Sequence, residues 1–224
     1  MTQSSIKDLL PTSKHTIIAI VGASASGKSL FAQTIYNELL PELGEQSISI
    51  VKEDAYYHDQ SHLPMEQRLL TNYDHPNAFE HELLSEHLTQ LSQGNAIQTP
   101  IYCYKTHTRT ADTTTLLATK IILVEGIMLL ADAELRNKFS IKVYMDTPLD
   151  ICLIRRIKRD ILERGRSLES VTNQYVNTVR PMYYEHIKPL KRFADIVVTR
   201  GGKNRMAIEL IKAKIRQLSN NYNE

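Results

Sequence analysis

One segment of the sequence constrains the fold more than any other, because it matches the pattern G-x-x-x-x-G-K-[ST] at every fixed position. It consists of Gly22, Ala23, Ser24, Ala25, Ser26, Gly27, Lys28 and Ser29. Before it, residues 16–21 read TIIAIV, a β-branched run without polar alternation that predicts a strand buried on both faces. After it, residues 29–40 predict a helix that ends near Pro41. A phosphate-binding loop requires a strand, a glycine-rich turn and a helix in this order.

Each fixed position of this loop has a physical task. The glycines let backbone N–H groups turn inward to form an anion nest, and the following helix adds the positive end of its dipole. Lys28 can reach the β- and γ-phosphates of a nucleotide, and the Ser29 hydroxyl can coordinate Mg²⁺. The guanine-selecting sequence N-K-x-D of GTPases is absent, and a length of 224 residues favours a small-molecule kinase over a motor.

The rest of the chain alternates short apolar runs with helical patterns. Strands are predicted at 47–51, 120–124, 140–145 and 194–199, and helices at 82–93, 149–163 and 204–218. This alternation predicts one α/β domain over 1–224, with a mainly parallel sheet of the P-loop NTPase type flanked by helices. Residues 97–117 predict a β-hairpin excursion, the helix at 149–163 is very basic and broken at Gly165, and residues 1–15 predict a polar lead-in.

Composition excludes several classes of protein. A net charge of +2 gives no sign of a nucleic-acid partner. No stretch approaches the ~20 apolar residues of a membrane helix, and the N-terminal residues lack an apolar signal core. The two cysteines, Cys103 and Cys152, have neither metal-ligand nor redox spacing. We therefore expect reduced thiols in a cytoplasmic protein with no membrane partner.

Two carboxylates follow predicted strands. Asp54 comes just after the second strand and Glu125 just after the third. Because ligands bind at the carboxyl ends of parallel strands, both face the phosphate loop if these strands are neighbours. Phosphoryl transfer needs a base and a metal holder, so Asp54 is the predicted base, and Ser29, Glu125 and Asp54 are the predicted Mg²⁺ ligands, Glu125 directly or through water. Acids at strand ends also cap loops and helices, and Glu53 competes with Asp54 for the role of base.

Several ordered segments are more specific together than the loop alone. They read GASASGKS (22–29), EDAYY (53–57), NYDHP (72–76), PIYCYKTHTR (100–109), VEGIMLL (124–130), DTPLDICLIRRIKRDILERGRS (146–167) and RGGKNRMAI (200–208). On these segments the chain resembles the uridine kinase family of the P-loop kinase superfamily, over nearly its whole length. The resemblance implies transfer of a phosphate from ATP or GTP to the 5′-hydroxyl of uridine or cytidine, giving UMP or CMP, with Mg²⁺ as cofactor.

The resemblance also implies an acceptor pocket. Asp54 matches the family's catalytic aspartate. The side chains expected around the nucleoside are Tyr57, Tyr73, Asp74, Tyr102, His107, Arg156 and Gln174. The chemistry agrees, because an ionised Asp74 can accept both ribose hydroxyls and aromatic rings can stack on a pyrimidine. His107 can donate or accept a hydrogen bond, which suits both uracil O4 and cytosine N4.

On the donor side, the resemblance implies a set of catalytic cations. These are Lys28, Arg159, Arg164 and Arg166. The arginines belong to the basic run, which the resemblance identifies as part of a lid region over about 152–178 with Gly165 as its hinge. Guanidinium groups stabilise the charge that develops on a transferring phosphoryl group. The resemblance further implies a homotetramer and feedback inhibition by UTP or CTP at the acceptor site.

Plainer explanations exist for the same segments. NYDHP can be a simple proline-containing loop, His107 a surface residue, and the arginine-rich helix a solvated face. Since Tyr102 and Tyr104 alternate in a strand-like segment, one of them is expected to be ordinary packing. A nucleic-acid patch lacks the interleaved aromatic residues it would need.

Two rival functions follow from the loop. One is another kinase of the superfamily, such as phosphoribulokinase or pantothenate kinase, and the other is a regulatory module that binds a nucleotide without catalysis. Tyr102 and His107 argue against a sugar-phosphate acceptor, which needs cations rather than an aromatic wall.

Overall fold

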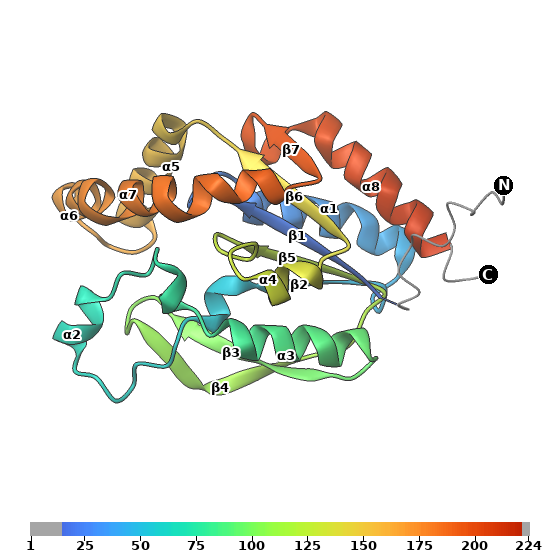
Figure 1. The fold of residues 1–224 in the computed structure, drawn as a ribbon, viewed down its shortest axis with the longest axis horizontal. Coiled ribbons are helices and arrows are strands. Elements are labelled where there is room, and N and C mark those ends of the chain that lie inside the picture. Colours follow the sequence, from blue (N-terminus) through green and yellow to red (C-terminus); the bar gives the residue numbers. More distant parts are fainter. Residues whose placement is uncertain (1–14, 221–224) are drawn as a thin grey trace, which may run out of the picture.

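The central sheet contains five parallel strands, and the computed structural model describes residues 15–220. The predicted lead-in at 1–15 therefore lies outside the described residues, apart from His15. The strands are β1 (Thr16–Gly22), β2 (Ile48–Lys52), β5 (Ile121–Gly126), β6 (Ile141–Asp146) and β7 (Ile196–Thr199). Their order is β2-β5-β1-β6-β7, with helices on both sides of the sheet (Figure 1). The predicted α/β fold with a parallel sheet is confirmed.

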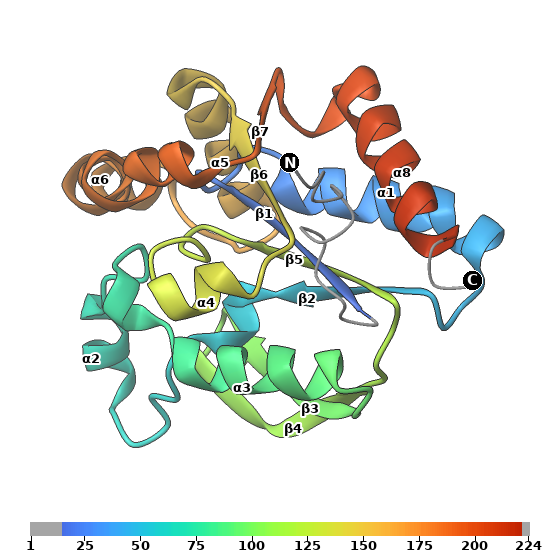
Figure 2. The ribbon, with the colours of Figure 1, turned by 45° about the vertical axis from the view of Figure 1, so that its right-hand side comes forward.

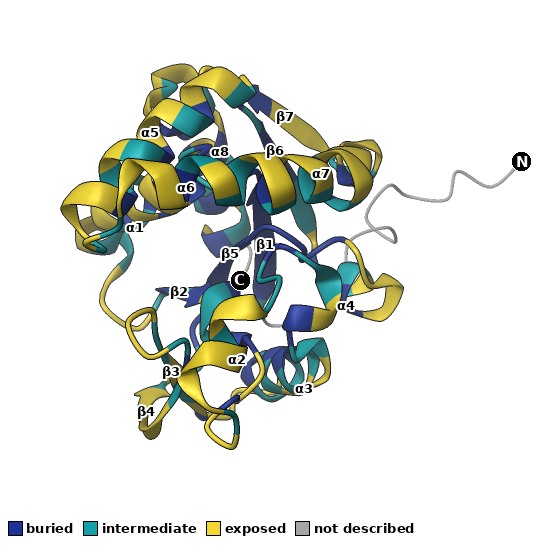
Figure 3. Cartoon of the chain, turned by 90° about the vertical axis from the view of Figure 1, so that its left-hand side faces the viewer, coloured by how far each residue is buried: buried dark blue, intermediate teal, exposed yellow. Residues whose placement is uncertain are grey.

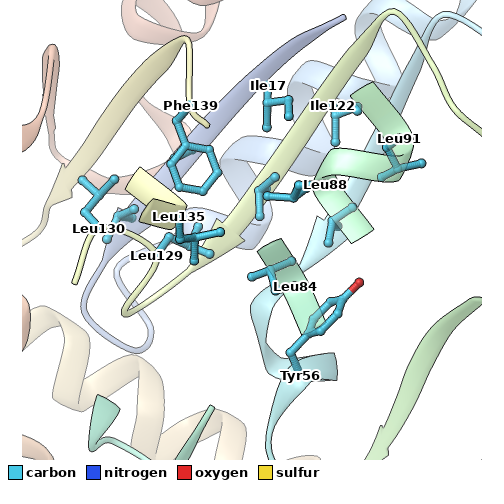
Figure 4. Packing of buried hydrophobic residues seen from close by; sticks show 14 of the residues in the cluster. Ile17, Tyr56, Leu84, Leu88, Leu91, Ile122, Leu129, Leu130, Leu135 and Phe139 are labelled. Carbon is cyan, nitrogen blue, oxygen red and sulfur yellow. The ribbon is translucent and has the colours of Figure 1, made fainter. Parts of the chain in front are cut away.

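Two hydrophobic cores cover the two faces of this sheet, because successive side chains of a strand point to opposite faces. The helices that pack on the sheet are α1 (Lys28–Leu43), α3 (His81–Ser92), α4 (Ala133–Asn137) and α8 (Arg205–Asn220). Ile18 and Ile20 of β1 join the core formed with α1 and α8, which lie side by side in Figures 1 and 2. Ile17 joins the other core, where Leu84 and Leu88 of α3 face the sheet (Figure 4).

The predicted hairpin at 97–117 forms a sheet of its own. Its strands, β3 (Ile97–Cys103) and β4 (Thr108–Leu116), pair antiparallel with an irregularity between Pro100 and Tyr102. Short helical segments connect β2 to α3. They are η2 (Glu53–Tyr56), α2 (Met65–Leu70) and η3 (Pro76–Ala78). The hairpin and α3 lie together below the central sheet in Figure 1.

The predicted lid region is mostly helical. Helix α5 (Leu149–Leu162) ends just before Gly165, whose φ of 65° is left-handed and turns the chain. After Gly165 the chain forms five successive helical segments: α6 (Leu168–Gln174), η4 (Tyr175–Val179), α7 (Arg180–Met182), η5 (Tyr183–Ile187) and η6 (Lys188–Phe193). Sequence patterns missed this run, since η4 and η5 are π-helical turns whose period departs from 3.6 residues.

Helix α1 ends close to the predicted position but passes through Pro41 to Leu43. Gly44 then adopts a φ of 88° and donates its N–H to the Leu40 carbonyl. Proline lacks a hydrogen-bond donor but keeps a helical φ, so the last turn tolerates it and the glycine ends the helix. The turn η7 (Gly201–Lys203) joins β7 to α8.

Every helix of the described part is too short or too polar to cross a membrane.

Candidate active site

A cavity of about 930 Å³ opens where β1, β2 and β5 end, a size suited to a small-molecule site. Most of the predicted site residues line it. They are Ser24, Ala25, Gly27, Lys28, Ser29, Asp54, Tyr57, Tyr73, Asp74, Tyr102, His107, Glu125, Arg156, Arg159, Arg164, Arg166 and Gln174. The predicted loop residues Gly22, Ala23 and Ser26 are not among the lining residues. In Figure 3, α5 and α6 lie on one side of the buried strand ends, and α2, β3 and β4 on the other.

The phosphate loop is closely packed. Gly27 has a φ of 103°, and a Cβ atom there would stand 2.6 Å from a backbone nitrogen of η7, so only glycine fits. Lys28 is buried, and its Nζ donates to the Ala23 carbonyl at 3.1 Å. Thr147 donates from Oγ1 to the Ser26 carbonyl at 2.8 Å, which joins the loop to the chain after β6. The hydrogen bond from Lys28 to Ala23 holds the ammonium group at the phosphate loop.

Two of the predicted carboxylates end adjacent strands, as the sequence led us to expect. Glu125 of β5 pairs in register with Lys52 of β2, two residues before Asp54. The Ser29 hydroxyl donates to Glu125 Oε1 at 2.9 Å. Burial raises the pKa of Glu125, and the nearby Lys28 ammonium opposes that shift. The three predicted metal ligands therefore line one cavity with the phosphate loop.

Glu53 has a structural role and does not line the cavity. Its side chain is fully buried, and Oε2 accepts the backbone N–H groups of Ile127 at 2.6 Å and Met128 at 2.9 Å. Its Oε1 lies 2.8 Å from His81 Nε2. These contacts use both oxygens, so Asp54 is the acid of the pair that faces the cavity.

Aromatic rings form one wall of the cavity. Tyr57 lies with its ring centroid 5.3 Å from that of Tyr73 and 4.9 Å from that of Tyr102, and it stacks on Phe79 at 4.4 Å. The Tyr73 hydroxyl donates to the His107 carbonyl at 3.2 Å. His107 occupies the hairpin turn with a φ of 52°, a conformation uncommon outside glycine. Burial lowers the pKa of His107, so the neutral ring offers one donor and one acceptor at neutral pH.

Asp74 lies in this cavity with little exposure to solvent. Burial raises the pKa of its carboxyl group, and the Arg156 guanidinium opposes the shift. Arg156 donates from Nη2 to Gln174 Oε1 at 3.0 Å and from Nη1 to Ser24 Oγ at 3.1 Å. The pair predicted to lie near the ribose thus connects α6 to the phosphate loop.

The predicted arginines surround a residue that sequence reasoning missed. Asp160 is fully buried, and its Oδ1 lies 2.9 Å from Arg159 Nε and 3.5 Å from Arg164 Nη1. Its Oδ2 lies 3.5 Å from Arg156 Nε and 3.6 Å from Arg166 Nη1. The sequence did contain a signal for this role. Asp160 is a single acid within the basic run, and Arg156 and Arg164 lie four residues before and after it, a spacing that favours ion pairs on a helix. One carboxylate therefore organises the guanidinium groups of the lid region.

Tyr104 is the second residue that sequence reasoning left unassigned. Tyr102 packs against the aromatic cluster, whereas the Tyr104 hydroxyl donates to Asp54 Oδ2 at 2.5 Å. Both tyrosines line the cavity, and Tyr102 also takes part in hydrophobic packing. Alternation along a strand could not separate them, because their contacts come from distant segments.

The chain is similar to known proteins over most of its length. The Phosphoribulokinase / Uridine kinase family matches residues 17–207. The chain is 58% identical to the uridine kinase of Vibrio atlanticus over 90% of this chain and 95% of that one. It is 57% identical to the uridine kinase of Vibrio cholerae over the same shares of the two chains.

Solved structures with low identity share the fold. A possible uridine kinase from Bacillus stearothermophilus has a TM-score of 0.57 at 22% identity, covering 85% of this chain and 92% of that one. D-glycerate 3-kinase from Cryptococcus neoformans has a TM-score of 0.60 at 14% identity, covering 79% and 80%. The family match spans most of the described chain, and the phosphate loop and acidic strand ends lie within it. The chain therefore belongs to the phosphoribulokinase/uridine kinase family.

Proposed function

We propose that this protein is a uridine and cytidine kinase of pyrimidine salvage, which transfers the γ-phosphoryl group of ATP or GTP to the nucleoside 5′-hydroxyl. One observation carries the proposal: a single cavity is lined by the phosphate loop, by Asp54 and by the rings of Tyr57, Tyr73 and Tyr102. A donor site for a triphosphate and an aromatic acceptor site therefore meet. Uridine kinases that are 57–59% identical to this chain support the same function.

The proposed chemical step needs a base and a positive environment. Asp54 accepts the proton of the 5′-hydroxyl as the hydroxyl oxygen attacks the γ-phosphorus in line. The new O–P bond forms while the bond to the β–γ bridging oxygen breaks, and the nucleoside diphosphate leaves. Lys28 and the arginines Arg159, Arg164 and Arg166 stabilise the charge on the transferring group. All of these side chains line the cavity.

The residues present also fit a Mg²⁺ ion. The Ser29 hydroxyl and the Glu125 carboxylate are hard oxygen ligands 2.9 Å apart at the phosphate loop, and Asp54 lines the same cavity. The described residues contain no group of three or more acidic, His or Cys ligands, and an ion held mainly by nucleotide phosphates and water needs none. Ser29, Glu125 and Asp54 would hold the ion, which would neutralise charge on the phosphates of a bound nucleotide.

Acceptor recognition uses groups of different chemistry. Asp74 is buried from water, so the ribose hydroxyls supply the hydrogen bonds that its carboxylate accepts. The Arg156 guanidinium lies nearby and favours the ionised form of this carboxylate. The tyrosine cluster stacks on or borders the pyrimidine, and His107 meets the edge where uracil and cytosine differ. The neutral imidazole offers both hydrogen-bond types, which suits both bases.

Substrate specificity tests this proposal directly. ATP turnover is measured with uridine, cytidine, adenosine and ribulose 5-phosphate as acceptors. We expect kcat/KM for uridine or cytidine to exceed that for adenosine by about a hundredfold or more, because the pocket presents polar groups matched to a pyrimidine. Transfer to ribulose 5-phosphate instead would place the chain in another branch of its family. ATP binding without acceptor-dependent ADP release would identify a regulator.

The metal ligand Glu125 gives a second test. Glu125→Gln keeps an acceptor for the Ser29 hydroxyl but removes the negative charge. We expect the Mg²⁺ concentration for half-maximal activity to rise about tenfold or more. The control is Glu134→Gln, an exposed acid on α4 outside the cavity. An unchanged Mg²⁺ dependence would remove Glu125 from the metal site.

Three wider properties belong to the same proposal. We infer a homotetramer, inhibition by UTP or CTP at the acceptor site, and a cytoplasmic location in which the free thiols of Cys103 and Cys152 stay reduced. Light scattering after size exclusion measures the first. Competition between CTP and uridine measures the second, with competitive inhibition expected.

A further inference from the structure

Tyr104 connects three parts of the site that are distant in sequence. It follows β3 directly in the hairpin turn, and its hydroxyl donates to Asp54 Oδ2 at 2.5 Å. The Arg164 guanidinium lies over its ring, with Cζ 4.2 Å from the centroid. The edge of the ring meets Tyr102 with centroids 5.2 Å apart and planes at 82°. One side chain thus touches the proposed base, the aromatic wall and the lid region.

Packing of the fold does not account for these contacts. Tyr104 is 42% exposed, and it belongs to none of the hydrophobic clusters of the described residues, whereas Tyr102 packs against one of them. Its polar and cationic contacts are to groups that line the cavity. Loss of its hydroxyl therefore removes little from the core.

The hydroxyl contact restricts the orientation of the Asp54 carboxylate. A phenol is protonated at neutral pH, so the Tyr104 hydroxyl is the donor in this contact. An ionised carboxylate accepts through both oxygens, and Tyr104 occupies Oδ2. The other oxygen stays available for the proton of an acceptor hydroxyl. A base held in one orientation reaches the reactive geometry more often than a freely rotating one.

The ring contact acts on the donor side. Arg164 lies between α5 and α6, and its Nη1 is 3.5 Å from Asp160 Oδ1. The face of the Tyr104 ring attracts the guanidinium, and the ring and Asp160 together hold Arg164 at the cavity wall. Without the ring, Arg164 keeps a long ion pair to the buried Asp160, in which the arginine itself is 28% exposed.

We propose that Tyr104 is a positioning residue that couples the two halves of the site: its hydroxyl orients Asp54, and its ring holds Arg164 toward the nucleotide. This inference rests on the proposed kinase function. The two roles belong to different atoms of one side chain, so different substitutions separate them.

Two variants test the two roles. Tyr104→Phe removes the hydroxyl and keeps the ring; we expect kcat to fall about tenfold, with the KM values for ATP and uridine unchanged. Tyr104→Leu removes both; we expect the same fall in kcat, and in addition an ATP affinity weakened several-fold. Nucleotide affinity is measured separately by titration with a fluorescent ATP analogue, which requires no turnover.

A matched control exists in η5. Tyr184 is 47% exposed, with Arg180 and Lys188 over its ring, and it does not line the cavity. Tyr184→Phe and Tyr184→Leu should leave kcat and nucleotide affinity at the wild-type values. Thermal unfolding of all four variants shows whether the Tyr104 effects exceed any loss of stability.

The possible results distinguish a failure of the Tyr104 proposal from a failure of the proposed kinase function. A wild-type chain that phosphorylates neither nucleoside overturns the proposed function, and nucleotide titration of Tyr104→Leu still tests the ring contact. Active wild-type enzyme with a Tyr104→Phe variant of equal kcat overturns the orientation of Asp54 by the hydroxyl. Equal ATP affinity for the Phe and Leu variants overturns the role of the ring. A fall in kcat that only accompanies a similar loss of thermal stability also overturns the proposal.

Discussion

Replacing Asp54 with asparagine is expected to lower kcat by about a thousandfold, because the variant keeps the shape of the side chain but cannot accept a proton. Nucleotide affinity should change little, since Lys28 and the loop backbone remain in place. The asparagine amide can still accept the Tyr104 hydroxyl through its oxygen, so the hairpin keeps that contact. Single-turnover kinetics with uridine, together with equilibrium titration of ATP, measure the two effects separately.

Two companion variants make the Asp54 result specific. Asp112→Asn changes an exposed acid on β4 outside the cavity and should leave kcat unchanged. Glu53→Gln should act mainly on stability, since the Glu53 carboxylate accepts two buried backbone N–H groups and contacts His81. A near-normal kcat for Asp54→Asn would assign the base elsewhere, and selective loss of kcat in Glu53→Gln would point to Glu53.

The second large effect is expected at Asp160. Asp160→Asn removes the charge that lies among Arg156, Arg159, Arg164 and Arg166 while keeping the volume of the side chain. The guanidinium groups then repel one another and move from the cavity. We expect kcat/KM for ATP to fall by a factor of about 10²–10³. This is less than the roughly 10³–10⁵ that an arginine in the transition state contributes, because the substitution displaces the arginines without removing them.

Asp160→Asn should also lower the free energy of unfolding by about 3 kcal/mol, because the substitution breaks a buried ion pair. This figure is at the lower end for such pairs because three of the four arginines are about 28–29% exposed and partly screened. Urea denaturation measures this loss. The control is Asp150→Asn, an exposed acid in the first turn of the same helix, for which only a small change in stability is expected. Wild-type kinetics in Asp160→Asn would show that the arginines orient themselves without it.

Much of the fold was predictable from local patterns. The phosphate loop has fixed residues at fixed spacing, and buried parallel strands are continuous apolar runs that differ from the surrounding helices. The neighbouring positions of β2 and β5 brought Asp54 and Glu125 to one edge, as strand order in such sheets suggests. Local patterns failed at the π-helical turns after α6, whose period departs from 3.6 residues.

The phosphate loop was recognisable from the sequence itself, because its glycines and Lys28 stand at fixed spacing and the Lys28 side chain bonds to Ala23 within the same eight positions. Its packing against η7 and Thr147 came from the tertiary structure. Only the tertiary structure decided which of two adjacent acids faces the cavity, since Glu53 and Asp54 have nearly the same local signal and differ in what packs around them. It also decided the contacts of Tyr104, which meets Asp54 from 50 residues away. Contacts of this kind arise when separate elements pack, and they leave no periodic pattern along the chain.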